Sequence, residues 1–248
     1  MRKLVAVLAC RNNGSRLYGK PLQNLDIENG ISILDNIIAC LSSYDCIDLV
    51  VLGISEGDEN LGYVDYANTK GLQYVIGDET DVLSRIIACG EHVSATDIFR
   101  ITSESPFPYF EMISMVWEEH INKNDATFLD NIIDGCGIEI IKLAALKKSH
   151  DKGQRKHRSE FCSLYIREHK DDFNTQILSP TKELIRKDLR LTVDYPEDLI
   201  VCRAIYEEFK EYAPMIPLLK VVRFLDNNQS LKKLTLPFCE SGYSTMYS

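Results

Sequence analysis

The chain has 248 residues, of which 45% are hydrophobic and 26% charged, a composition typical of a globular protein with a sizeable core. Its net charge of −9 argues against general binding to nucleic acids or membrane surfaces, although a local basic pocket remains compatible with it. The sequence contains no run of about 18 apolar residues, and its first apolar run is too short for a signal peptide, so we expect a cytoplasmic protein without a transmembrane helix.

The cysteine pattern favours the same compartment. The eight cysteines are scattered and form no C-x-x-C pair. Most of them sit in apolar runs, which is typical of buried free thiols in a reducing environment. The five histidines have no ligand spacing with the cysteines, so a zinc site is not expected.

The amino-terminal segment is the first that indicates chemistry. The apolar run Leu4–Cys10 predicts a buried strand. The polar loop after it carries three cations, Arg11, Arg16 and Lys20. A glycine-containing basic loop after a strand is a common way to hold a phosphate chain, although a solvated basic loop explains the same residues equally well. A P-loop is excluded, because Pro21 stands where that motif has Ser or Thr.

Strand and helix patterns then alternate along the first half of the chain. Expected strands are Asp48–Ile54, Leu72–Ile76 and Ile98–Thr102, and expected helices are Ile31–Ser43, Asn60–Lys70, Val82–His92 and Phe110–Ile121. This alternation predicts right-handed βαβ units, hence an α/β protein with three α/β/α layers, Rossmann-like, around a mostly parallel mixed sheet. Functional residues should gather in the loops that begin at Arg11, Gly77 and Ser103, where strands end.

The pattern becomes less regular after about residue 126. The expected strands are Ala126–Asp130, Cys136–Ile141 and Leu189–Val193. Four helices are expected: one that starts at Lys142, one over Ser159–Lys170, one from Pro196 through Tyr212 and one from Pro217 to about Leu225. No linker or internal repeat is visible, so we interpret residues 1–248 as one domain. The segment of about 134–187 is interpreted as an insertion, and 213–248 as a carboxy-terminal helix followed by a tail, Leu236–Ser248, whose lack of pattern favours disorder.

The insertion also suggests an oligomeric state. Its strand Cys136–Ile141 is expected to lie outside the main sheet, where it would leave an unprotected edge. We therefore expect a homodimer contact in this segment.

The strongest single motif is Leu-Thr-Val-Asp-Tyr-Pro-Glu-Asp-Leu, residues 191–199. It places Asp194 at the end of an expected strand, and Pro196 opens a helix in its first turn. Asp194 is explained either as the N-cap of that helix or as a metal ligand. Asp198 is expected to face solvent or to support the start of the helix through the helix dipole.

These segments together resemble the cytidylyltransferases, which include the sialic acid and ketodeoxyoctonate activating enzymes and the spore-coat-polysaccharide type of nucleotidyltransferase. The pattern R-x-x-x-x-R-L-x-G-K-P-L from Arg11 to Leu22 and V-D-x-P-E-D-L around Asp194 carry the likeness, which covers most of residues 3–211. The resemblance implies the nucleotide-diphospho-sugar transferase fold, a homodimer, and two substrates, CTP and a small-molecule acceptor, with no nucleic-acid or membrane partner.

The resemblance also implies roles for individual residues. The catalytic residues are then Lys20, Arg11 and Arg16, and the nucleotide is bound by Ala9, Cys10, Arg11, Asn12, Gly14, Lys20, Thr80 and Asp81. Mg²⁺ is held by Asp194 and by Glu104, which stands in Arg100-Ile-Thr-Ser-Glu-Ser-Pro106 where the family has R-I-T-G-D-C-P. The acceptor is contacted by Arg85, Glu139, Arg158 and Glu160. Helix capping explains Thr80 or Asp81 equally well, an ordinary polar loop explains Glu104, and a solvated surface explains Arg158.

The implied activity is a CTP-dependent cytidylyl transfer that releases pyrophosphate, in the biosynthesis of a surface polysaccharide such as a capsule. The acceptor is either a sugar acid or sugar phosphate, or a small phosphorylated metabolite such as a phosphorylated amino acid. Departures from the family pattern at Gly137, Ser159 and Phe161 favour a non-standard acceptor. Two alternatives remain: a glycosyltransferase of the same fold, although Ser103-Glu-Ser105 lacks its D-x-D motif, and a non-catalytic nucleotide-binding regulator.

Overall fold

A seven-stranded sheet forms the centre of this computed structural model, which describes residues 2–12 and 16–246. The strands lie in the order β5-β4-β1-β6-β8-β7-β9. Their bounds are β1 Leu4–Cys10, β4 Leu49–Ser55, β5 Gln73–Gly77, β6 Asp97–Thr102, β7 Ala126–Leu129, β8 Ile138–Lys142 and β9 Thr175–Leu178. The strands β5, β4, β1 and β6 are parallel, β8 is antiparallel to both of its neighbours, and β9 is parallel to β7. The predicted mostly parallel mixed sheet is confirmed.

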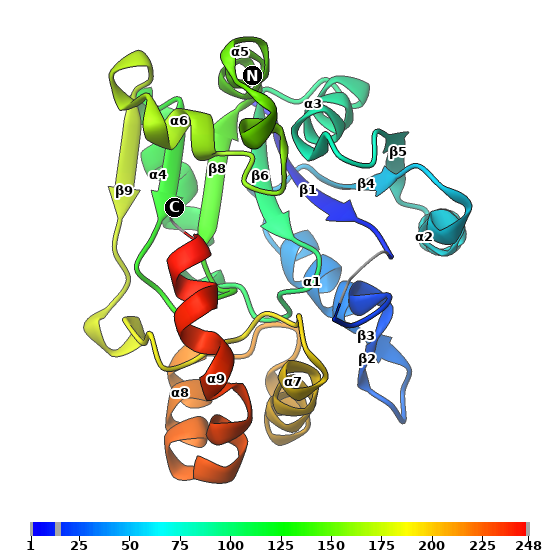
Figure 1. Cartoon of the computed structure of the whole chain (residues 1–248), viewed down its shortest axis with the longest axis vertical. Helices are drawn as coiled ribbons and strands as arrows, with labels where there is room; N and C mark the ends of the chain where they lie inside the picture. The colour runs from blue at the N-terminus through cyan, green and yellow to red at the C-terminus, as the bar shows by residue number, and fades with distance from the viewer. Residues whose placement is uncertain (1, 13–15, 247–248) are drawn as a thin grey trace.

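Helices cover both faces of this sheet, as the sequence predicted (Figure 1). Alternate residues of the buried strand β1 point to opposite faces: Leu4, Ala6 and Leu8 pack into one core, and Val5 and Val7 into the other. The first core includes α1 Ile33–Ser42, α2 Leu61–Lys70, α4 Ile113–Lys123, α7 Pro196–Phe209 and α8 Leu218–Asn227, and the second includes α3 Val82–His92, α5 Leu143–Lys152 and α6 Leu164–Glu168.

The remaining elements lie around these layers. A small hairpin joins β2 Asn24–Asp26 to β3 Ile31–Ser32, and α9 Gln229–Met246 packs against α7 and α8. Short 3₁₀ helices are η1 Lys20–Leu22, η2 Asp58–Asn60, η3 Phe110–Met112, η4 Arg155–Arg158, η5 Lys170–Asp172, η6 Lys182–Leu184 and η7 Lys210–Tyr212. None of the helices in the described part of the chain has the length and apolar character needed to cross a bilayer.

Three expectations for the second half of the chain are wrong. The run Leu189–Val193 is buried but is not a strand, because its single bridge, between Arg190 and Asp134, joins it to the loop between β7 and β8 and not to a strand of the sheet. The tail is helical, because Thr235 and Cys239 bury one side of α9 against the protein although Pro237 weakens the helical signal. The helix expected over Ser159–Lys170 is limited to the five residues of α6.

The structural reason given for a dimer is also wrong. The strand expected over Cys136–Ile141 is β8, and it lies inside the main sheet between β6 and β7. Both of its edges are therefore paired, so it needs no partner subunit for protection. The homodimer stays a prediction that rests on the resemblance alone.

Candidate active site

The ends of β1 and β6 bring two functional loops together. These parallel neighbours are in register, with Ala9 opposite Thr102, so the loops that follow them start side by side. The Ser103 hydroxyl donates to the Ala9 carbonyl oxygen at 2.7 Å and ties the two loops together. A cavity of about 630 Å³ opens at this edge of the sheet.

The basic loop after β1 aims its last cation into this cavity. Gly19 has φ 58°, a left-handed conformation that favours glycine, and its N–H donates to the Asn12 carbonyl oxygen at 3.4 Å. The chain then enters η1, whose first residue is Lys20. The Lys20 ammonium lies 2.5 Å from one carboxylate oxygen of Asp194. Two predicted residues, 174 positions apart, are thus in direct contact.

The segment before α7 places Asp194 beside Glu104. The Val193 N–H donates to the Glu104 carbonyl oxygen at 3.0 Å, and the Leu191 N–H donates to the Asp134 carbonyl oxygen at 2.8 Å. The helix itself is not capped by Asp194. Its N-cap is Tyr195, and the backbone N–H groups of Asp194 and Tyr195 donate to the Asp198 carboxylate at 2.8 and 2.9 Å. The N-cap explanation of Asp194 is therefore wrong.

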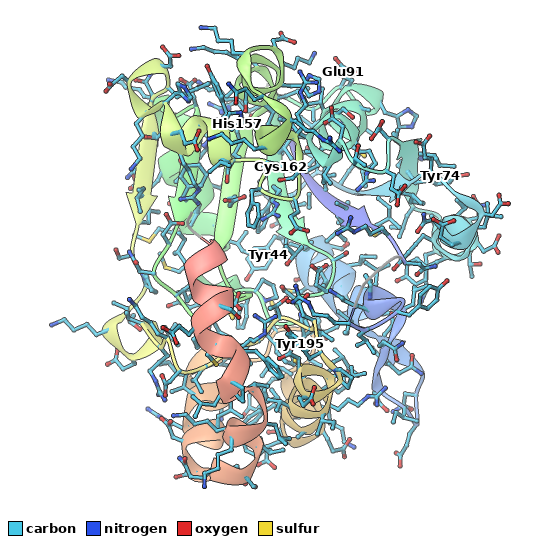
Figure 2. All side chains as sticks on the ribbon, in the orientation of Figure 1. Tyr44, Tyr74, Glu91, His157, Cys162 and Tyr195 are labelled. Carbon is cyan, nitrogen blue, oxygen red and sulfur yellow. The ribbon has the colours of Figure 1, made fainter. Side chains whose placement is uncertain are left out.

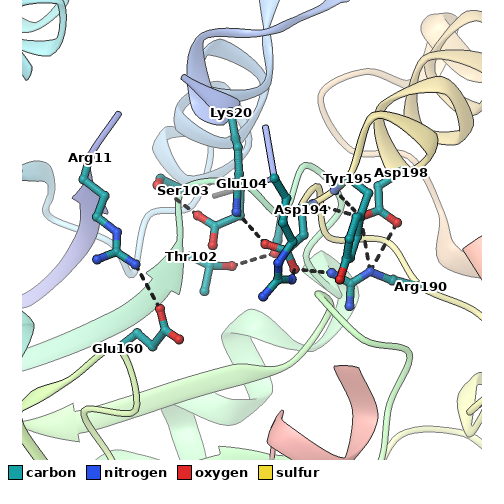
Figure 3. A network of polar contacts seen from close by, with 12 residues as sticks. Arg11, Lys20, Thr102, Ser103, Glu104, Glu160, Arg190, Asp194, Tyr195 and Asp198 are labelled. Atoms are coloured by element: carbon teal, nitrogen blue, oxygen red, sulfur yellow. Dashed lines mark hydrogen bonds and ion pairs between the residues drawn. The ribbon is translucent and has the colours of Figure 1, made fainter. Parts of the chain in front are cut away.

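A buried arginine that the sequence did not single out, Arg190, connects three aspartates beside the cavity (Figure 3). We call these four residues the charged corner. Arg190 is 3% exposed, and its guanidinium donates to Asp134 at 2.5 Å, to Asp198 at 3.2 Å and to Asp194. Asp198 is 1% exposed, so the expectation that it faces solvent is wrong, whereas its support of the helix start is confirmed. The spacing of Arg190 and Asp194, four residues apart, is the only signal in the sequence for their contact.

Burial and charge shift the carboxylates of this corner in opposite directions. Burial alone would raise the pKa of Asp194, but the hydrogen bond from Lys20 and the charges of Lys20, Arg190 and Arg16 lower it below the usual value. Burial raises the pKa of Glu104, and the negative charge of Asp194 raises it further against the opposing effect of Lys20. Burial likewise raises the pKa of Asp134 to about 6. Asp194 is thus the carboxylate held most firmly in its charged form.

Most of the predicted site residues line the same cavity. It is lined by the predicted residues Ala9, Arg11, Asn12, Arg16, Lys20, Arg85, Glu104, Glu160 and Asp194. Across its mouth the Arg11 guanidinium lies 3.4 Å from the Glu160 carboxylate, as Figure 3 shows. Arg85 is 1% exposed and donates to the Asp78 carbonyl oxygen at 2.8 Å.

Other predicted residues lie elsewhere. Cys10 is fully buried and does not line the cavity. Asp81 caps α3 by accepting from the Ser84 N–H at 2.8 Å, and Thr80 lies exposed beside it, so the capping explanation holds for Asp81. Gly14 lies outside the described residues.

The two remaining acceptor residues occupy different surroundings. Arg158 donates to the His150 carbonyl oxygen at 3.2 Å and does not line the cavity. Its neighbour His157 lies far from Tyr195 in Figure 2. Glu139 lines a second, smaller cavity of about 120 Å³ next to the first, where it accepts from Arg167 at 3.0 Å.

The carboxylates at the cavity suit a metal that is shared with a substrate. No group of three or more His, Cys, Asp or Glu side chains that could hold a metal is found among residues 2–12 and 16–246. Asp194 and Glu104 nevertheless face one cavity and interact electrostatically. Mg²⁺ is commonly bound through one or two carboxylates, with waters and substrate phosphates completing its octahedron. The donor set therefore fits Mg²⁺ bound together with a phosphorylated substrate.

Two relatives match nearly the whole chain, although no protein-family model matches it. An uncharacterised protein of Methanocaldococcus jannaschii is 26% identical over 244 residues, covering 97% of this chain and 98% of that protein. The spore coat polysaccharide biosynthesis protein SpsF of Bacillus subtilis is 25% identical over 239 residues, covering 92% of this chain and 96% of that protein.

Solved structures extend the comparison. A cytidylyltransferase from Leptospira borgpetersenii has a TM-score of 0.82 at 18% identity, covering 93% of this chain and 97% of that one. A CMP:2-keto-3-deoxy-manno-octonic acid synthetase complexed with CTP has a TM-score of 0.62 at 12% identity, covering 83% and 99%. The resemblance expected from the sequence is thereby confirmed: this chain has the fold of the cytidylyltransferases and is a relative of SpsF over nearly its whole length.

Proposed function

We propose that this protein is a CTP-dependent cytidylyltransferase that acts in the cytoplasm in the biosynthesis of a surface polysaccharide. The observation that carries the proposal is the convergence of Lys20, Arg16 and Asp194 in one cavity at the strand ends of this fold. Similarity to a polysaccharide biosynthesis protein and to a synthetase solved with CTP supports it. The eight free cysteines fit a reducing compartment.

The reaction requires positioning and charge compensation rather than a covalent intermediate. An oxygen of the acceptor attacks the α-phosphorus of CTP, the bond from that phosphorus to the bridging oxygen breaks, and pyrophosphate leaves with the electron pair. Lys20 and Arg16 oppose the charge on the phosphates, and Arg11 extends the positive surface at the mouth of the cavity. Cys10 is not a nucleophile in this mechanism, because burial raises its pKa to about 12.

Mg²⁺ held by Asp194 and Glu104 would neutralise phosphate charge and polarise the phosphoryl oxygens. Arg190 would orient Asp194 from behind, since its guanidinium contacts that carboxylate from the protein interior. Lys20 would exchange its contact with Asp194 for one with the phosphates.

The acceptor belongs in the second cavity, which shares Arg100, Thr102 and Asp134 with the first. We propose either a sugar acid or sugar phosphate, or a small phosphorylated metabolite such as a phosphorylated amino acid. Arginine charges there are matched by carboxylates, with Arg100 lying 3.4 Å from Glu139. This balance of positive and negative charge suits the hydroxyl-bearing part of an acceptor. The nucleophilic oxygen of the acceptor would then point toward the first cavity.

A pyrophosphate-release screen tests the proposal. All four nucleoside triphosphates are combined with a panel of sugar acids, sugar phosphates and phosphorylated metabolites, with Mg²⁺ and with EDTA. We expect release with CTP and one acceptor class, lost in EDTA. Consumption of a nucleotide sugar without pyrophosphate would favour the glycosyltransferase alternative, and nucleotide binding without turnover would favour a regulator. Light scattering at micromolar concentration tests the homodimer.

A further inference from the structure

The carboxy-terminal helix α9 reaches the cavity with one face. Phe238, Ser241 and Gly242 are spaced three and four residues apart, so they lie on the same side of the helix. Ser241 and Gly242 line the cavity. Figure 1 shows α9, in red, rising from α8 toward the sheet. A segment that the sequence presents as a featureless tail thus forms part of the candidate site.

Gly242 lies close to two charged side chains at the site. A Cβ atom at position 242 would collide with the Arg190 guanidinium and with the Asp134 carboxylate. These are the groups that hold Asp194 from behind. The helix therefore packs directly against these charged groups, and a larger residue at position 242 would force their side chains to move.

Tyr195 connects α9 with the basic loop. Its ring stacks on the ring of Phe238, with centroids 3.9 Å apart and planes at 9°. The guanidinium carbon of Arg16 lies 4.9 Å from the centroid of the same Tyr195 ring. Because Phe238 covers one face of the ring at stacking distance, the guanidinium occupies the other face. The three side chains form a stack that runs from α9 to the phosphate-binding loop.

Among the residues that the structure describes, the partners of Arg16 are the Tyr195 ring and the Asp194 carboxylate at 3.7 Å. When Asp194 takes part in binding a metal and a nucleotide, its attraction for Arg16 is shared with the new cation. The Tyr195 ring, unlike the Asp194 carboxylate, is not expected to bind the metal, so its contact with Arg16 would persist. Arg16 is half-exposed, and a long, half-exposed side chain loses conformational entropy when it is immobilised on a ligand.

We infer that Tyr195, supported by Phe238 of α9, is a positioning residue that holds Arg16 in place for the nucleotide phosphates. This inference rests on the proposed function of the cavity. It makes α9 part of the nucleotide site and predicts an effect on the affinity for CTP rather than on the chemical step.

The test compares variants by CTP calorimetry and by the kinetics of pyrophosphate release. Tyr195→Leu should weaken CTP binding and raise KM about 3- to 30-fold, the range expected for the conformational entropy lost when an arginine side chain is immobilised, with kcat nearly unchanged. Tyr195→Phe keeps the ring and should bind CTP as the wild type does. Phe238→Leu leaves Tyr195 unsupported and should give an intermediate loss. Tyr212→Leu is the matched control, because the Tyr212 ring carries the Lys220 ammonium at 4.6 Å and does not line the cavity.

A double-mutant cycle separates positioning from general stability. In an Arg16→Leu background, Tyr195→Leu should cause no further loss of CTP affinity. An equal loss in both backgrounds, or wild-type affinity in Tyr195→Leu and Phe238→Leu, overturns the inference and leaves the proposed function standing. A wild-type protein that neither binds nor turns over CTP overturns the proposed function and the inference with it. If Tyr195→Leu does not fold, the cycle is made with Phe238→Leu.

Discussion

Replacement of Arg190 by methionine removes the cation from a corner that contains three carboxylates. Arg190 is 3% exposed, and its guanidinium lies 2.5 Å from Asp134, 3.2 Å from Asp198 and in contact with Asp194. Methionine is of similar length and apolar, so the main loss is the charge and its hydrogen bonds. Removing one partner from a buried ion pair costs about 3–5 kcal/mol, because the other partner is left charged and unpaired. We expect Arg190→Met to lose stability of this order at pH 7.

The pH dependence of the variant follows from the same contacts. Burial already raises the pKa of Asp134 to about 6, and loss of the neighbouring cation raises it further. The pKa of an aspartate in the unfolded chain is about 3.9. Between this pH and the folded-state pKa of Asp134, the folded state therefore binds more protons than the unfolded state does. The contribution of Asp134 to stability therefore rises as the pH falls from 7 to 5, and it rises more steeply in Arg190→Met than in the wild type.

Urea unfolding at pH 7 and pH 5 measures both effects. The matched control is Arg186→Met, because Arg186 also bridges two aspartates, Asp188 at 2.8 Å and Asp226 at 2.7 Å. Both of these carboxylates are at least 40% exposed, so the pairs should contribute no more than about 1 kcal/mol each. If Arg190→Met costs no more than Arg186→Met, or if its loss of stability relative to the wild type is not smaller at pH 5 than at pH 7, the buried charge is not what stabilises this corner.

Three further predictions use the same protein. Lys20→Ala should lower kcat at least about a hundredfold with little change in Tm, because it removes charge compensation from a loop; a near-normal kcat would remove Lys20 from the mechanism. Asp194→Asn should abolish Mg²⁺-dependent activity, whereas Glu104→Asp should keep this activity or raise the affinity for the metal. Both effects are measured as activity against Mg²⁺ concentration, and a wild-type curve for Asp194→Asn would refute the metal assignment. Burial lowers the pKa of His120, so the contribution of this residue to wild-type stability should fall by up to about 1.4 kcal/mol per pH unit below pH 6.5, in opposition to the rise from Asp134. His120→Gln should remove this loss in urea titrations, and the exposed His92→Gln should not.

The sequence predicted well those elements whose own apolar pattern shows which of their faces are buried. Strand β1 is apolar on both faces and α3 has a regular apolar stripe, so their types follow from composition alone. The short edge strand β9 has no buried residue, which leaves no alternating signal. The run Leu189–Val193 has the apolar pattern of a strand, but its backbone bonds go to the loops at Glu104 and Asp134 instead of to a neighbouring strand. An apolar pattern predicts that a segment is buried, whereas the hydrogen-bonding partners of its backbone determine whether the segment forms a strand.

The same distinction applies to the site. Lys20 and Asp194 were predicted because strand ends and family-like motifs mark them, and the structure places them in contact. Arg190 was missed because an arginine inside an apparent strand is expected to point to solvent. Its burial depends on Asp134, 56 residues earlier, and on Asp198, four residues after Asp194. Tyr195 was missed for a similar reason, since its stacking partner Phe238 lies in a segment without a clear pattern.

The distribution of charge in the free protein bears on how a metal would enter the site. Three cations surround Asp194: Lys20 at 2.5 Å, Arg16 at 3.7 Å and Arg190 in direct contact. A divalent cation arriving alone would meet this positive charge, which the other carboxylates lining the cavity, Glu104, Asp134 and Glu160, offset in part. The phosphates of a nucleotide would attract Lys20 and Arg16 away from Asp194, and this would free carboxylate oxygens for a metal bound to those phosphates. If the proposed function is right, we therefore expect the metal and the nucleotide to enter together.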